Sequence, residues 1–246
     1  MTTKPVSLSK ALSKQPTFVQ FSIWLVGDTP LITHAWSFKA KNEMLQKQVK
    51  ATKAGKEARE PKQDFVDSLY EMDKKVYGFP VTGIKNAILS SAHKDKGIPR
   101  STVMSALYLN AEMVRTRPAL AGAVCDMPLV RIWGTEPEMR EDMVRIGAGI
   151  QKTANLAYRA QFTRWAIKLS GTFNNTVMTA DQVAFLISES GLACGLGEWR
   201  NEKKGVFGAY HMATSAEEDA WDKFAAGKGK LPALVDRASL FAVAAE

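Results

Sequence analysis

Residues 191–210, which read GLACGLGEWRNEKKGVFGAY, combine glycines, cations and aromatic rings. Walker and Rossmann phosphate loops follow a strand and open a helix, whereas this segment lacks GK[ST] and is expected to follow a helix and lead into a strand. It predicts a flexible loop whose unhindered backbone N–H groups and cations contact phosphates while its rings stack on bases, as in single-strand binders. The alternative is a solvated turn with Trp199 packed in the core. The candidate residues are Gly195, Gly197, Gly205, Gly208, Trp199, Arg200, Lys203 and Lys204.

A second candidate site is the basic stretch of residues 37–62, where eight Lys or Arg residues oppose three Glu residues. Its sparse apolar residues cannot anchor a core face, so it is expected to leave the domain as a helical or disordered excursion. The one-sided charge favours a lobe that faces nucleic acid, and a solvated charged helix is the alternative. The candidate residues are Lys39, Lys41, Lys47, Lys50, Lys53, Lys56 and Arg59, together with Arg159 and Arg164 near the predicted central strand.

Histidines and cysteines give little basis for catalysis or metal binding. His34, near Asp28 in sequence, is the one candidate for general acid or base work. No Ser-His-Asp order, HExxH motif or carboxylate pair at catalytic spacing occurs. Cys125 and Cys194 lie far apart without a CxxC motif, so reduced thiols are expected. The sequence therefore predicts a protein without enzymatic activity, metal or cofactor.

The chain that positions these candidates alternates strands and helices. Residues 18–26 predict a first strand closed by a turn, residues 162–173 a central strand, and residues 179–193 a helix with Thr179 as N-cap. The other expected elements are a short strand or bend at 76–80, a helix between 81 and 97, a helical segment at 101–109, strands at 112–118 and 129–133, and a last strand at 206–212. The predicted class is α+β, a ferredoxin-like, RRM-like antiparallel sheet with helices on one face. Residues 140–150 receive no assignment.

Length and composition favour a single domain with additions. A chain of 246 residues with 46% hydrophobic content can bury one sizeable core. We expect a flexible arm at 1–16, a ferredoxin-like domain at 17–213 with a basic lobe inserted at 37–75, and a tail at 214–246. The apolar end of the tail is expected to dock on its own domain or on a second copy, so a homo-oligomer or filament is expected.

Charge and hydropathy indicate the kind of partner. The net charge of +8 and the pI of about 9.4 attract polyanions by electrostatic steering and counterion release. No stretch approaches the roughly 18 uninterrupted apolar residues of a membrane span, and no apolar signal core occurs near the start. The sequence predicts a cytoplasmic protein that does not bind membranes.

Several segments in order resemble a family of bacteriophage and prophage proteins over about residues 18–212. They are GDTPLITHAWS with the basic stretch, EAREPKQDFVDSLYEM, YGFPVTGIKNAI, EPEMREDMVRIG, YRAQFTRWAIKLS and GLGEWRNEKKGVFGAYHM. The helix, glycine-rich loop and strand also resemble the RAMP superfamily, which includes the Cas7-like backbone subunits of CRISPR complexes and has a ferredoxin-like, RNA-binding fold.

This resemblance implies a protein of a bacterial host cell that polymerises along a nucleic acid. Some RAMP relatives cleave RNA with an aspartate or histidine after the first strand, and Asp28 and His34 are nearest by position without a motif to secure them. Three functions compete: a Cas7-like binder that coats single-stranded RNA or DNA, a RAMP-type endoribonuclease, and a phage protein that blocks or recruits a host partner. The first is the predicted function.

Overall fold

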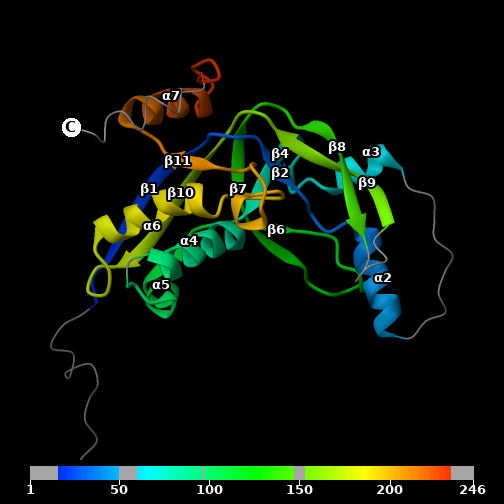
Figure 1. The fold of residues 1–246 in the computed structure, drawn as a ribbon, viewed down its shortest axis with the longest axis horizontal. Coiled ribbons are helices and arrows are strands. Elements are labelled where there is room, and N and C mark those ends of the chain that lie inside the picture. The colour runs from blue at the N-terminus through cyan, green and yellow to red at the C-terminus, as the bar shows by residue number, and fades with distance from the viewer. Residues whose placement is uncertain (1–15, 50–59, 96, 147–152, 234–246) are drawn as a thin grey trace, which may run out of the picture.

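The computed structural model describes residues 16–49, 60–95, 97–146 and 153–233, which form an α+β fold (Figure 1). Three predictions fall outside these residues. They concern the N-terminal arm up to residue 15, the cations Lys50, Lys53, Lys56 and Arg59, and the apolar tail from residue 234 onward.

The main sheet is mostly antiparallel and centres on β1 (Phe18–Gly27) and β10 (Trp165–Asn174). β11 (Tyr210–Met212) pairs with the outer edge of β1, and β7 (Asp126–Gly134) pairs with β10. The strand order is β11-β1-β10-β7-β4-β3, with β4 at Val76–Pro80 and β3 at Glu71–Asp73. The short strands β5 (Leu107–Leu109) and β6 (Glu112–Arg115) pair with β10 and β7. The strands expected at 18–26 and 76–80 are confirmed.

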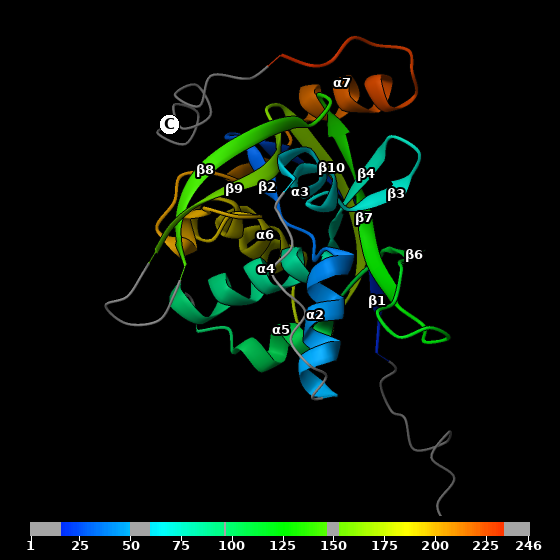
Figure 2. The ribbon, with the colours of Figure 1, turned by 90° about the vertical axis from the view of Figure 1, so that its right-hand side faces the viewer.

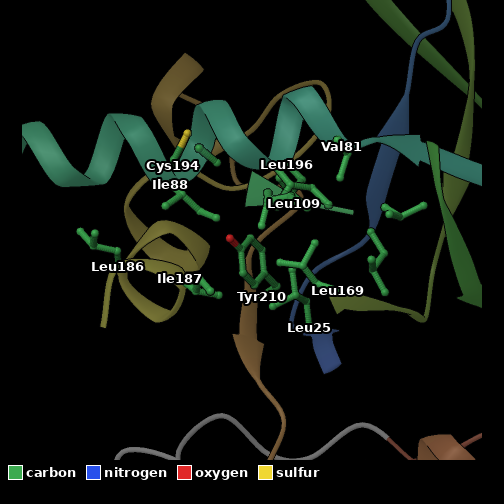
Figure 3. Close-up of a cluster of buried hydrophobic side chains, with 14 of the residues drawn as sticks. Leu25, Val81, Ile88, Leu109, Leu169, Leu186, Ile187, Cys194, Leu196 and Tyr210 are labelled. Carbon is green, nitrogen blue, oxygen red and sulfur yellow. The ribbon is translucent and has the colours of Figure 1, made fainter. Parts of the chain in front are cut away.

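One face of this sheet packs against α4 (Val81–Asp95), α5 (Arg100–Ala106) and α6 (Ala180–Ala193). Side chains alternate along β10, so Trp165, Ile167 and Leu169 enter this core and are almost fully buried. Figure 3 shows side chains of α4, α6 and β11 converging there. α6 begins where the sequence predicted, because the Thr179 hydroxyl and the Gln182 side chain form a capping box.

The opposite face is covered by α7 (Ser215–Ala225). The rings of Trp24 and Trp221 stack with centroids 5.8 Å apart, and Trp24 Nε1 donates to Asp222 Oδ1 over 3.0 Å. Leu231 packs against the same cluster, so this part of the tail contacts its own domain. The prediction of helices on one face alone is therefore wrong: Trp221 gives α7 enough apolar surface to cover the second face.

A second sheet has the antiparallel order β2-β9-β8, formed by β2 (Leu31–Thr33), β9 (Thr153–Phe162) and β8 (Glu138–Ile146). The central strand predicted at 162–173 is confirmed as β10, but it begins at Trp165, because Phe162 ends β9 and the chain turns there from the second sheet into the main one. β8 covers much of the segment at 140–150 that received no assignment from the sequence. Its charged residues do not alternate with apolar ones, so the pattern of a half-buried strand is missing. α3 (Pro61–Asp67) packs against β9.

The basic insertion begins with α2 (Phe38–Gln48), whose N-cap Ser37 accepts a hydrogen bond from Ala40 N. None of its residues is buried, so the helix stands away from the core. α2 and α7 lie at opposite ends of the molecule in both views (Figures 1 and 2). Within the described ranges, no helix is long and apolar enough to cross a membrane.

Candidate functional site

The glycine-rich loop between α6 and β11 packs tightly against β2. Gly197 has a φ of 76°, and a Cβ at this position would lie 2.3 Å from Ile32 O. A side chain there would therefore combine a left-handed backbone with a backbone clash. This glycine serves the packing of the loop.

Backbone N–H groups of the loop are used within the protein. Leu196 N donates to Gly208 O over 2.8 Å, and Gly208 N donates to Pro30 O over 2.9 Å. Glu198 N donates to Ile32 O over 2.9 Å. The expectation that such groups stand unhindered for phosphates is wrong at these positions, because the loop satisfies its own backbone.

Arg200 is also held within the loop. Its Nη2 and Nε donate to Glu202 Oε2 over 2.9 and 3.2 Å, and its Nη1 donates to Gly197 O over 3.0 Å. These bonds engage three of the five N–H donors that a guanidinium offers. Lys203 and Lys204 are exposed on the following turn, and Trp199 remains 39% exposed. The loop's accessible chemistry therefore lies in these three side chains.

A cavity of about 390 Å³ lies between this loop, the start of α4 and the chain around His34. Ala87 and Leu196, both buried, contribute an apolar lining, and Thr82 and Asn86 of α4 add polar groups. The volume falls within the range of about 300–1,000 Å³ typical of small-molecule sites.

His34 and Glu198 form an ion pair in this cavity, with Nδ1 and Oε1 3.5 Å apart and both side chains nearly half exposed. The hydrogen bond from His34 and the charges of Arg159 and Arg200 hold the pKa of Glu198 below its ordinary value. Glu198 is therefore an ionised acceptor at neutral pH. The Tyr70 hydroxyl donates to His34 O over 3.1 Å and helps to fix this segment.

Glu202 and Cys194 line the cavity beside Arg200. Desolvation, the largest single influence on Glu202, is outweighed by hydrogen bonds from Arg200, Ser90 and Cys194, so the pKa of this carboxyl is lowered. Burial raises the pKa of the Cys194 thiol to about 11. The thiol stays protonated at neutral pH and does not act as a nucleophile.

Strands β8 and β9 carry charged side chains near the loop. Arg140 donates to Asp142 and Gln161 over 2.8 and 2.9 Å, and its guanidinium lies 4.5 Å from the Phe207 ring centroid. The Arg159 side chain is 11% exposed, and its Nη1 lies 3.7 Å from Asp142 Oδ2. Within the described part of the chain, Arg159 Nε and Nη1 have no hydrogen-bond partner. Arg159 thus acts on the cavity as a positive charge near Glu198.

A cationic surface forms where α2 meets the connection between β6 and β7. The Arg117 guanidinium lies 3.7 Å from the Phe38 ring centroid, and Lys41 Nζ donates to Arg117 O over 3.3 Å. Glu43 of α2 and Asp126, which pairs with Arg115, are nearby acids. We call α2 together with this connection the α2 patch. Lys41 and Arg117 are in contact there, and Lys39, Lys47 and Arg115 are the other cations of the two segments.

The predicted site residues are thus divided among separate places. Trp199, Arg200, Lys203, Lys204 and the glycines belong to the loop; Lys39, Lys41 and Lys47 belong to the α2 patch; Arg159 lies on β9. Arg164 lies apart, with Nη1 3.5 Å from Pro232 O. The sequence interpretation missed Trp36, Asn86, Arg140 and Glu198. Of these, only Trp36 carried a local signal, as an aromatic residue at the entrance to the basic stretch.

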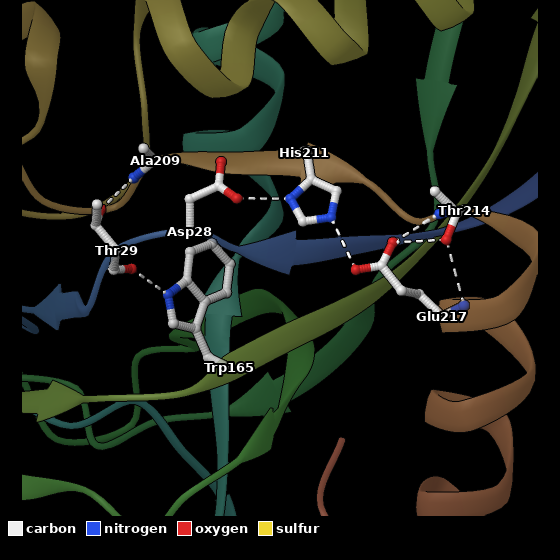
Figure 4. Close-up of polar contacts among 7 residues, drawn as sticks. All are labelled: Asp28, Thr29, Trp165, Ala209, His211, Thr214 and Glu217. Atoms are coloured by element: carbon white, nitrogen blue, oxygen red, sulfur yellow. Dashed lines mark hydrogen bonds and ion pairs between the residues drawn. The ribbon is translucent and has the colours of Figure 1, made fainter. Parts of the chain in front are cut away.

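Asp28 does not complete an acid–base pair with His34. Its Oδ1 lies 2.7 Å from His211 Nδ1, and His211 Nε2 lies 3.1 Å from Glu217 Oε1 (Figure 4). Asp28 and His34 are close in sequence, but their side chains have different partners and do not form one acid–base site.

No protein-family model matches this chain, and no curated protein matches it. Across the described ranges, no group of three or more His, Cys, Asp or Glu side chains is placed to hold a metal ion.

Proposed function

We propose that this protein binds single-stranded RNA or DNA in the cytoplasm of a bacterial cell and that several copies assemble along one strand. The α2 patch carries the proposal: Lys41 and Arg117, 76 residues apart in sequence, meet there, and the exposed Lys39, Lys47 and Arg115 on the same two segments add to the positive charge. A cluster of this kind attracts phosphates and releases their counterions. The net charge of +8 strengthens the attraction at longer range.

An exposed ring favours single strands as the polyanion. Trp36 directly precedes the N-cap of α2 and is 60% exposed. A single strand offers the faces of its bases to such a ring, and a cationic surface beside it follows the phosphates. Duplex bases are stacked on each other, so they gain less from Trp36.

A ferredoxin-like fold of the RAMP type is part of the proposal. The order β11-β1-β10-β7 supports it, because this is the fourth, first, third and second strand of a split β-α-β unit. α4 follows β1 and precedes β7, and α6 connects β10 to β11, as that unit requires.

Assembly along the strand rests on the apolar residues near the end of the chain. Leu231 packs on its own domain, and the residues from 234 onward lie outside the described part. Light scattering of complexes on strands of increasing length tests assembly. A mass of one protein chain on every strand would oppose it.

Neutralising the α2 patch is expected to weaken binding and flatten its salt dependence. In the triple variant Lys39→Gln, Lys41→Gln and Lys47→Gln, each lost phosphate contact lowers the slope of log K against log salt by about 0.7. Fluorescence anisotropy with a labelled single strand over a salt series measures both quantities. The matched control neutralises the exposed Lys223, Lys228 and Lys230 near α7, at the other end of the molecule. Equal effects of the two triple variants would contradict a role for the α2 patch.

Removing the ring of Trp36 is expected to weaken single-strand binding by about 1–3 kcal/mol, the range for one stacked base. The salt slope should stay unchanged, because Trp36→Ala removes no charge. Val206→Ala, at another highly exposed apolar side chain, is the control. The same anisotropy titration checks the prediction, and a melting curve verifies the fold. An unchanged affinity for Trp36→Ala would mean that bases do not stack there.

An endoribonuclease is the second candidate function, favoured by the His34–Glu198 ion pair in the cavity. A histidine and a carboxylate could exchange protons with a ribose 2′-hydroxyl and a leaving oxygen. Incubation of labelled RNA with the protein, with His34→Ala as the comparison, decides this candidate. Intact RNA in both samples would leave binding as the function.

A further inference from the structure

The cavity offers a flat ligand both apolar surface and hydrogen-bond acceptors. Tyr70 and Phe79 line it with rings in edge-to-face contact, their centroids 6.4 Å apart. Asn86 carries an amide that can donate and accept, and Glu198 carries a carboxylate that accepts. This combination of rings with a few directional polar groups is what recognition of an unstacked base requires.

The charges in the cavity exclude phosphate. Arg200 is bound to Glu202 and to Gly197 O, so three of its five N–H donors and the adjacent negative charge of Glu202 are already matched within the protein. Glu198 has His34 as its partner at 3.5 Å, and both side chains are nearly half exposed. A ligand that enters next to Glu198 must therefore bring N–H donors, since a phosphate would meet two carboxylates.

Bases differ in the donors that they offer to a carboxylate. Cytosine, adenine and guanine carry an exocyclic amino group, and glutamate pairs with the amino group of cytosine in known base contacts. Uracil and thymine instead present two carbonyl oxygens beside a single N–H, and these oxygens face a carboxylate unfavourably.

We propose that this cavity receives one nucleobase with an exocyclic amino group, turned out of the bound strand, and that Glu198 accepts the hydrogen bond from that group. The inference rests on the proposed single-strand binding and adds a base preference to it. Phosphates stay outside the cavity, on cationic surfaces such as the α2 patch.

The test compares oligo-dC with oligo-dT of equal length at one salt concentration. The wild-type protein should bind oligo-dC about fivefold or more tightly, as expected for one directional base contact. Glu198→Ala should abolish this preference, and Glu198→Gln should move it toward oligo-dT, because the glutamine amide can donate to a thymine carbonyl. Asp219→Asn on α7 removes an exposed carboxylate elsewhere and should keep the preference. Because the comparison is a ratio between two strands, intrinsic differences between them cancel across the variants.

Other outcomes separate this inference from the proposed function. Salt-dependent binding of both strands without a preference, or with a preference that Glu198→Ala leaves intact, would overturn the pocket and retain single-strand binding. Failure to bind either strand would overturn the proposed function. Free cytidine and uridine, titrated onto the protein by NMR, then decide the pocket: shifts at Asn86 and Glu198 with cytidine alone support it, and their absence overturns it. Equivalent shifts with an arginine-bearing peptide would reassign the cavity to a cationic protein partner.

Discussion

Gly208→Ala is expected to destabilise the protein by about 2–5 kcal/mol, the sum of about 1–2 for a left-handed alanine and about 1–3 for forced overpacking. Gly208 has a φ of 67°, and a Cβ on it would lie 1.8 Å from Leu196 O. This carbonyl cannot retreat easily. Leu196 is held beside Gly208, because Leu196 N donates to Gly208 O over 2.8 Å.

A matched control isolates the clash from the backbone conformation. Gly227 has a φ of 70°, and a Cβ there would meet nothing within 4 Å. Gly227→Ala should therefore cost only the left-handed term of about 1–2 kcal/mol. Urea unfolding of both variants measures the difference. Equal losses of stability would show that the loop can move away from a methyl group at position 208.

The glycines also show where sequence reasoning reached its limit. Their number and their cationic neighbours correctly marked a loop between a helix and a strand. A glycine-rich loop with this sequence pattern is expected in two cases: where the backbone comes close to the phosphates of a ligand, and where it comes close to carbonyl oxygens of the same protein. Only the position of Ile32 and Leu196 relative to Gly197 and Gly208 separates these causes.

Elements with local signals were predictable, and elements stabilised by distant partners were not. Thr179 and Gln182, three residues apart, form a capping-box motif that predicts the start of α6 from the local sequence. β8 carries charges on both faces, and its place as a strand depends on pairing with β9, for example Arg140 opposite Arg159. The cavity likewise joins His34 to Glu198 across a long stretch of chain, so neither residue marks the other in the sequence.

His211→Ala is the other change with a large expected effect, a destabilisation of about 3–5 kcal/mol. His211 lies between two carboxylates, Asp28 Oδ1 at 2.7 Å and Glu217 Oε1 at 3.1 Å, whose side chains are 7% and 10% exposed. Removing the ring leaves both acids buried without the cation that compensates them. Because Glu217 belongs to α7, the loss should also loosen this helix from β11. The free energy of unfolding from urea titrations measures the effect, and a variant as stable as the wild type would contradict it.

The same network predicts a dependence of stability on pH. Burial, the largest single influence, favours the neutral ring, but the hydrogen bonds and charges of Asp28 and Glu217 together raise the pKa of His211 above its usual value. A group with a raised folded pKa stabilises fully below its unfolded value of about 6.5, and this contribution disappears as pH rises through the folded pKa.

Glu217 Oε2 also accepts from Thr214 N over 2.9 Å, so the acid that holds His211 also caps the first turn of α7. Melting temperatures should therefore fall with rising pH above about 6.5 more steeply for the wild type than for His211→Gln, which cannot titrate. Parallel curves for the two proteins would mean that His211 does not couple protonation to the docking of α7.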